Sequence, residues 1–138
     1  MDEIIRFGVS LPANLLRHFD KNIEEKGYTS RSEAIRNLIR QSLVDSQWEN
    51  SSSETAAAVV LVYDHHNSSL TDQLTKEQHV HHRHVIATMH SHLDHDNCIE
   101  VVLLRGPAKT VKSIAQKLSS AKHIKFNRFV PATSGREI

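Results

Sequence analysis

Hydrophobic and polar residues alternate from residue 3 to residue 11, in the stretch EIIRFGVSL. The apolar members would lie on one face of a β-strand, with the residues between them on the other face. These apolar members are Ile5, Phe7, Val9 and Leu11. The pattern then changes to a helical period over residues 15–23, which Gly27 ends, and a second helix is expected after the capping-box sequence SRSE at residues 30–33. One strand followed by two helices is therefore predicted.

Such a module cannot bury its strand alone. A single strand has two open edges, and a domain of this size encloses too little surface, since even domains of roughly 60 residues are marginal. A second copy solves both problems, because two strands can pair as an antiparallel ribbon over four helices. The module at residues 1–44 is therefore predicted to be an obligate dimer.

The rest of the chain has a different plan. The polar, serine-rich stretch DSQWENSSSET at residues 45–55 is predicted to be a linker. Residues 56–132 then run strand, helix, strand, strand, helix, strand, which is the order of a ferredoxin-like α+β domain. The strands are expected at residues 56–65, 84–93, 98–106 and 123–132, and the helices at residues 69–82 and 107–121. Residues 133–138 are expected to form a loose tail.

Composition excludes several classes of protein. The formal net charge is only +1, so any DNA-binding function would have to rest on a local surface. The single cysteine rules out an internal disulfide, and the first residues are acidic where a signal peptide would be basic. The longest apolar run, AAAVVLVY, is too short to span a bilayer. We therefore expect a cytoplasmic protein with no membrane partner.

Histidine is concentrated in residues 79–98, which hold seven of the eleven histidines and the only cysteine. His90 and His92 would leave the same face of a strand, and Cys98 would return to that face from the next strand. Imidazole and thiolate ligands suit nickel, copper, zinc or cobalt rather than magnesium or calcium. The residues themselves leave the metal open. They also allow a hydrolytic zinc enzyme, in which Glu100 would be the general base.

Two motifs together resemble a known family. The N-terminal strand followed by GYTSRSEAIRNLIR resembles the ribbon–helix–helix repressors, which read DNA with a two-stranded ribbon. The segment QHVHH followed by HSHLDHDNCIE resembles the regulatory domain of the nickel-responsive repressors. The resemblance covers about residues 4–130. It implies an allosteric homotetramer, a dimer of dimers with an ACT-like regulatory core, that binds a palindromic operator in double-stranded DNA when nickel is bound.

The resemblance also implies how nickel is held. His90, His92 and Cys98 of one chain, with His79 of another chain, would bind one Ni(II) per chain in a plane. Ligating histidines usually donate their second N–H to a carboxylate or a carbonyl group. The residues expected to support the ligands in this way are Glu100, His65 and His95.

DNA recognition is expected on the polar face of the N-terminal strand, where Arg6, Gly8 and Ser10 lie. Arginine can form two hydrogen bonds with a guanine, which contribute about 1–3 kcal/mol of discrimination between bases. Backbone N–H groups at the start of the second helix would position a phosphate. The residues at that helix start are Thr29, Ser30 and Arg31.

The sequence departs from the family pattern at three places. Gly8 stands where a polar residue is usual, and the loop HHNSSL at residues 65–70 lacks the basic residues that touch DNA. Asn37 stands where the family can use an aspartate, together with the residue matching Glu33, to bind a monovalent cation such as potassium between domains. The docking of DNA-binding dimers against the core is therefore expected to follow different rules in this protein.

Other proteins share parts of this pattern. A copper-, cobalt- or zinc-responsive regulator of the same architecture would use the same types of ligand. A ribbon–helix–helix antitoxin would usually end in a short disordered tail, whereas this chain continues into a second folded domain. The metalloenzyme is disfavoured because the match at His79 fills the position that a catalytic water would need.

Overall fold

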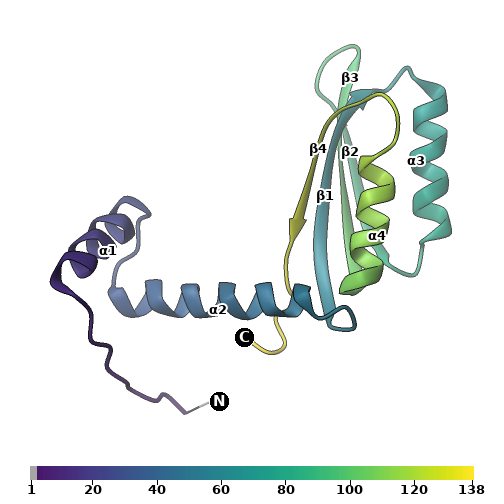
Figure 1. Cartoon of the computed structure of the whole chain (residues 1–138). Coiled ribbons are helices and arrows are strands. Elements are labelled where there is room, and N and C mark those ends of the chain that lie inside the picture. Colours follow the sequence, from purple (N-terminus) through teal and green to yellow (C-terminus); the bar gives the residue numbers. More distant parts are fainter. Residues whose placement is uncertain (1–2) are drawn as a thin grey trace. The chain divides into compact units, whose positions relative to one another are not determined.

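The computed structural model describes residues 3–138 (Figure 1). The chain divides into two compact units that meet inside one helix, between Gln41 and Ser42. The first unit holds helix α1 (Ala13–Glu25) and most of helix α2 (Arg31–Glu49). Among residues 3–138, no helix is both long enough and apolar enough to cross a membrane.

Within the single chain, residues 3–11 form no hydrogen-bonded strand, so the ribbon expected between two copies stays a prediction. Its apolar side chains are exposed, and Phe7 keeps 68% of its accessible surface. A strand needs a neighbour to satisfy its backbone N–H and C=O groups, and one chain supplies none. Ile5 and Phe7 border an open groove against Leu16 and Ile39, and a second copy is the partner that the sequence leads us to expect there.

Helix α1 begins and ends, and helix α2 begins, as their sequences predict. Pro12 directly precedes α1, and Gly27 follows it with a φ of +78°, a left-handed conformation that favours glycine. The hydroxyl of Ser30 accepts a hydrogen bond of 3.2 Å from the N–H of Glu33, which caps α2. The Glu33 carboxylate accepts instead from the Thr29 hydroxyl, so only half of the expected capping box forms.

The expected linker at residues 45–55 is mostly not a linker. Helix α2 continues to Glu49, and the first strand begins at Glu54, so residues 50–53 alone connect them. Val44 and Trp48 lie one turn apart on the helix and both pack against the core of the second unit. This apolar pair extends the helix through a segment whose serine-rich composition is typical of a loop.

The second unit has the predicted order of strands and helices. Its elements are β1 (Glu54–Asp64), α3 (Ser68–Val80), β2 (Val85–His92), β3 (Asn97–Pro107), α4 (Ala108–Ser119) and β4 (Ile124–Pro131). The strands form an antiparallel sheet in the order β2-β3-β1-β4, and both helices lie on the same face of it (Figure 1). The ferredoxin-like α+β plan is confirmed.

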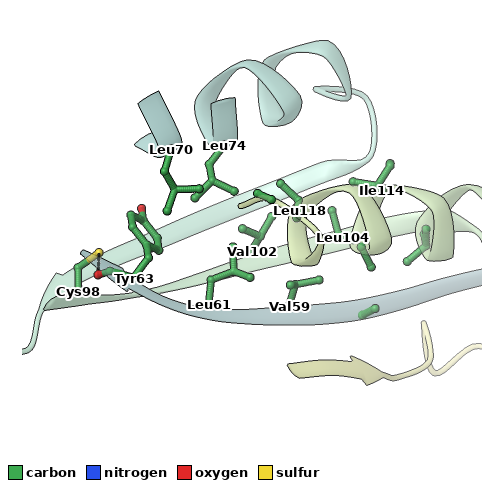
Figure 2. Packing of buried hydrophobic residues seen from close by; sticks show 14 of the residues in the cluster. Val59, Leu61, Tyr63, Leu70, Leu74, Cys98, Val102, Leu104, Ile114 and Leu118 are labelled. Carbon is green, nitrogen blue, oxygen red and sulfur yellow. Dashed lines mark hydrogen bonds between the residues drawn. The ribbon is translucent and has the colours of Figure 1, made fainter. Parts of the chain in front are cut away.

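The core lies between the sheet and its two helices. Residues along β1 alternate between buried and half-buried, because one face of the strand is covered. Figure 2 shows Val59 and Leu61 packed with Val102 of β3 and Leu118 of α4. Cys98 lies at one end of this apolar layer, beside Tyr63. Within residues 42–138, no helix covers the other face of the sheet (Figure 1).

Candidate metal centre

The hairpin of β2 and β3 positions three of the four expected ligands. In the antiparallel register, His92 lies directly opposite Cys98, and His90 lies directly opposite Glu100. Residues opposite each other in a sheet project to the same face, so all four side chains lie on one side of the hairpin. Cys98 and Glu100 are buried positions of β3, and the residue between them is not. These four side chains therefore lie on the side of the sheet that the helices cover.

Cys98 has a different environment from the two histidines. Its side chain is fully buried, and its Sγ donates a 3.5 Å hydrogen bond to the carbonyl oxygen of Tyr63 (Figure 2). His90 and His92 are exposed on the edge strand. Burial raises the pKa of the Cys98 thiol, and the nearby carboxylates of Glu100 and Asp64 raise this pKa further. Metal binding at this position would therefore displace a proton from the sulfur.

The structure places the ligand atoms of the expected residues apart. Among residues 3–138, the only group of three or more His, Cys, Asp or Glu side chains with ligand atoms within 4.8 Å is His66, His95 and Asp96. The ring centroids of His90 and His92 are 5.6 Å apart, and the His92 ring stacks at 4.3 Å on that of His65. Both imidazoles would have to turn toward the sulfur to bind one ion.

His79 lies apart from the other three in its own chain. It occupies the last turn of α3, where its side chain is exposed and its ring centroid is 6.4 Å from that of His82. Neighbouring Gln78 is half-buried, so these two adjacent residues have different environments. An exposed imidazole at the end of a helix is available to another subunit.

A buried carboxylate links the hairpin to helix α3. Glu100 is 7% exposed, and its two oxygens accept hydrogen bonds of 3.3 Å from the Tyr63 hydroxyl and 3.1 Å from the Gln78 amide. The Gln78 carbonyl in turn accepts a 2.6 Å bond from Thr88 of β2. Burial raises the pKa of Glu100, while the adjacent His90 lowers it. Burial also raises the pKa of Tyr63, whose hydroxyl therefore remains a donor.

Sequence analysis missed Tyr63 and Gln78. Tyr63 stands at an inward-facing position of β1 opposite Cys98, and the alternation of that strand could have placed it there. Gln78 precedes His79 on a helix with a weak apolar stripe, and no feature of the sequence indicates which way it points. Both residues hold Glu100, which sequence analysis expected to support the metal ligands.

His65 contacts one of the expected ligands, whereas His95 bonds within its own turn. His65 touches His92 by ring stacking, and its Nε2 lies 2.7 Å from the backbone oxygen of His95. The ring of His95 bonds Asp96, at 2.9 Å from Nδ1 to the carboxylate. In the same turn, Asp94 accepts bonds from Asn97 and from the backbone, which lower the pKa of Asp94 to about 2. Support of the ligands by His65 and His95 stays a prediction.

The expected DNA-contacting residues lie in two places in the first unit. Arg6, Gly8 and Ser10 belong to the exposed N-terminal stretch, and an added side chain at Gly8 would meet no atom within 4 Å. At the start of α2, Arg31 forms two hydrogen bonds of 2.7 and 2.8 Å with Asp20, which clip α1 to α2. Ser30 caps the same helix start.

A module that resembles a ribbon–helix–helix unit, joined to a domain with a histidine–cysteine hairpin, defines a metal-responsive DNA-binding protein. The family model for the NikR C terminal nickel binding domain matches residues 56–131. The model for ribbon-helix-helix proteins of the copG family matches residues 5–46. The nickel-binding match lies within the second unit of the structure, and the ribbon-helix-helix match covers most of the first unit and extends a few residues beyond it.

Curated relatives match the full length of the chain. The chain is 52% identical to a nickel-responsive regulator of Geobacter sulfurreducens and 50% identical to one of Geotalea uraniireducens, in each case over all of this chain and 99% of the relative. A solved structure of an uncharacterized protein from Thermotoga maritima aligns with a TM-score of 0.51 at 13% identity, over 56% of this chain and 96% of that one. That likeness concerns the fold alone.

The chain therefore belongs to the family of nickel-responsive transcriptional regulators. It is a DNA-binding repressor with a nickel-binding domain, and it is not an enzyme. The family also decides between the metals that the ligand types had left open, in favour of nickel.

Replacing Cys98 by alanine should abolish tight nickel binding. The substitution removes the only thiolate ligand and leaves two neutral imidazoles on the hairpin, so affinity should fall by more than about 100-fold. Nickel titration with absorption spectroscopy measures the loss, because the thiolate–nickel charge-transfer band should disappear. Ser91→Ala, between the two histidines on the opposite face of β2, should bind nickel normally. Undiminished affinity in Cys98→Ala would rule out this centre.

Proposed function

We propose that each Ni(II) is bound by ligands from two chains, with one ion per chain. His90, His92 and Cys98 would come from one hairpin, and His79 from helix α3 of another subunit. The observation that carries the proposal is the placement of these groups: three share one face of a hairpin, whereas His79 is exposed on a separate element, at the end of a helix. Thiolate and imidazole ligands in a plane suit Ni(II) or Cu(II), and membership of the nickel-responsive family favours Ni(II).

Subunit mixing tests whether the ligands are shared. Neither His79→Ala nor Cys98→Ala alone should bind nickel tightly, because each variant lacks one ligand at every site. When the two variants are refolded together, an intact site needs three ligands from one variant and His79 from the other. Random assembly should restore about one quarter of the sites, measured as bound nickel per chain. A mixture that recovers no sites would indicate that all ligands come from one chain.

We propose that the regulatory units assemble into the core of a homotetramer through the open face of their sheet. This face carries apolar side chains on all four strands, of which Leu103 is 41% and Met89 is 73% exposed. The others on this face are Val60, Val62, Val101, Phe126 and Val130, and Arg128 lies between the last two. Apolar side chains exposed on four neighbouring strands are typical of an interface rather than of a solvated surface. Dimers of the first unit would flank this core, which makes the molecule a dimer of dimers.

Replacing Leu103 by aspartate should break the tetramer. A carboxylate at the centre of an apolar interface would lose its hydration without gaining a partner. Sedimentation velocity should detect dimers in place of tetramers at micromolar protein concentration. The matched control Gln116→Asp adds the same charge on the exposed side of α4 and should sediment as the wild type does. A Leu103→Asp tetramer would place the interface elsewhere.

We propose that nickel increases the affinity of the repressor for a palindromic operator. Two-fold symmetric dimers of the first unit match two half-sites of a palindrome, and Arg6 and Ser10 lie on the ribbon face that would enter the major groove. A complete switch between idle and competent states requires about 5.5 kcal/mol of differential binding. Metal coordination provides energy of that order, and by linkage DNA would raise nickel affinity by the same factor.

Arg6 should provide much of the preference for the operator. The operator is first selected from a random DNA pool, and affinities for it and for unrelated DNA are measured on nickel-loaded and nickel-free protein. Wild type should bind the operator more tightly with nickel. Arg6→Ala should reduce the ratio of specific to non-specific affinity at least about tenfold, because a two-bond contact with guanine is lost.

The control for charge is Lys21→Ala in the same unit. It also removes one positive charge and should weaken both kinds of binding alike, leaving their ratio unchanged. An unchanged ratio in Arg6→Ala would mean that the ribbon face is not the reader. An operator affinity that nickel does not alter in the wild type would refute the proposed switch.

We further propose that Glu33 contributes to a site for a monovalent cation such as potassium, as the family resemblance implies. Its exposed carboxylate accepts one hydrogen bond from Thr29, which leaves acceptor capacity for a cation. Asn37 would contribute less, because its amide already donates to the Tyr28 hydroxyl. The protein would act in the cytoplasm, where its operator lies.

A further inference from the structure

The last turn of α2 is fixed to the regulatory sheet by Trp48. This side chain is 6% exposed and belongs to the core cluster of the second unit. Its Nε1 donates a 2.8 Å hydrogen bond to the backbone oxygen of Ala132, just beyond β4. Its ring meets that of Phe129 edge to face, with the centroids 5.4 Å apart and the planes at 85°. Strand β4 therefore holds the helix end by both a polar contact and an aromatic one.

Helix α4 holds the same residue from a second direction. The Lys112 ammonium donates a 2.7 Å hydrogen bond to the backbone oxygen of Trp48 and lies 5.9 Å from the centroid of the indole ring. A lysine bonded to a carbonyl at a helix C-terminus satisfies a group that the helix leaves unpaired and complements its dipole. The Trp48 clamp, which consists of Trp48, Lys112, Phe129 and Ala132, therefore joins α2 to two elements of the regulatory unit.

The residues around the clamp are tied down as well. The N–H of Ala108 donates to the Ser53 oxygen at 2.9 Å, and the N–H of Lys109 donates to the Ser51 oxygen at 3.1 Å. These bonds attach the serine-rich turn to the start of α4. The hydroxyl of Thr133 also bonds the Gln47 side chain at 3.0 Å. The turn after α2 is consequently part of the regulatory unit and does not act as a flexible joint.

Helix α2 itself is continuous from Arg31 to Glu49 and contains no glycine or proline. Sharp kinks in helices usually need such residues, so the helix favours transmission of movement over bending. Its first part carries the cap and the Arg31–Asp20 pair of the DNA-binding unit. Helix α2 therefore begins in the DNA-binding unit, and its last turn is held by hydrogen bonds to the metal-binding unit.

We propose that Trp48 and Lys112 are positioning residues for operator binding, which connect the nickel-loaded regulatory core to the DNA-binding helices. The inference rests on the proposal above that nickel raises operator affinity. With the clamp intact, ordering of the regulatory core by nickel also orders the ends of the α2 helices. With the clamp loosened, each α2 end gains freedom that operator binding must remove again, so nickel loses its effect on DNA while it still binds.

The test compares Trp48→Phe and Lys112→Met in the full-length protein. Trp48→Phe keeps an aromatic ring in the core but loses the hydrogen bond to Ala132, and Lys112→Met keeps the length of the side chain but loses its bond to the helix end. The measured quantity is the nickel response, defined as the ratio of operator affinities with and without Ni(II). Each variant should lower this ratio at least about fivefold, which is the size expected for one hydrogen bond. Nickel affinity should stay within about twofold of the wild type.

Lys117→Met is the matched control. It removes the same charge from the exposed surface of the same helix, so it should preserve the nickel response even if general attraction to DNA declines. The double variant should lower the response by less than the product of the two single effects, because both substitutions open one clamp.

Trp48 supplies an independent signal because it is the only tryptophan in the chain. Its emission should be that of a buried indole in the wild type and should shift to longer wavelength in Lys112→Met. The inference is overturned if both variants keep the wild-type nickel response, or if they lose nickel affinity together with it, since the clamp would then merely support the fold. A wild type without any nickel response would instead refute the proposed function, and this inference with it.

Discussion

The central position of β3 is the constraint on which the metal centre depends. This strand pairs with β1 on one side and β2 on the other, and Cys98 is therefore directly opposite both Tyr63 and His92. A shift of one residue in either pairing would send the cysteine to the other face, away from the histidines. The apolar layer of Leu61 and Val102 makes such a shift costly, because it would expose the core. The register of β3 with its two neighbours thus determines both the packing of the core and the position of Cys98.

The sequence predicted the elements of the second unit well because alternation and helical spacing were strong there. It also placed His90, His92 and Cys98 on one face, since strand geometry requires this. It failed at the linker, where serine-rich composition concealed the helical spacing of Val44 and Trp48. It could not find Gln78, because the direction of a side chain on a weakly amphipathic helix depends on contacts with distant strands. The proposed role of His79 as a ligand in another subunit depends on contacts between chains, which the hydrophobic pattern of a sequence does not encode.

The candidate site includes more than the expected ligands, because Glu100 connects the hairpin to helix α3 through its hydrogen bonds. The core surrounds this carboxylate, which would be costly to bury without partners. Tyr63 and Gln78 each give it a hydrogen bond, and Gln78 is the neighbour of His79. The same carboxylate therefore lies beside His90 on the hairpin and holds the helical turn that presents His79 outward. A movement of His90 would therefore be expected to shift the helical turn that holds Gln78 and His79, through their shared contact with Glu100.

The exposed N-terminal stretch has a consequence for the life of the protein in a cell. In the single chain this segment exposes apolar side chains, and the proposed pairing with a second chain would cover them. Extended, unprotected segments are the substrates that proteases cleave most readily. Unpaired subunits would thus be removed while assembled ones persist. Quality control by degradation would then set a lower limit on the concentration at which repressor accumulates, and a cell would contain complete molecules or almost none.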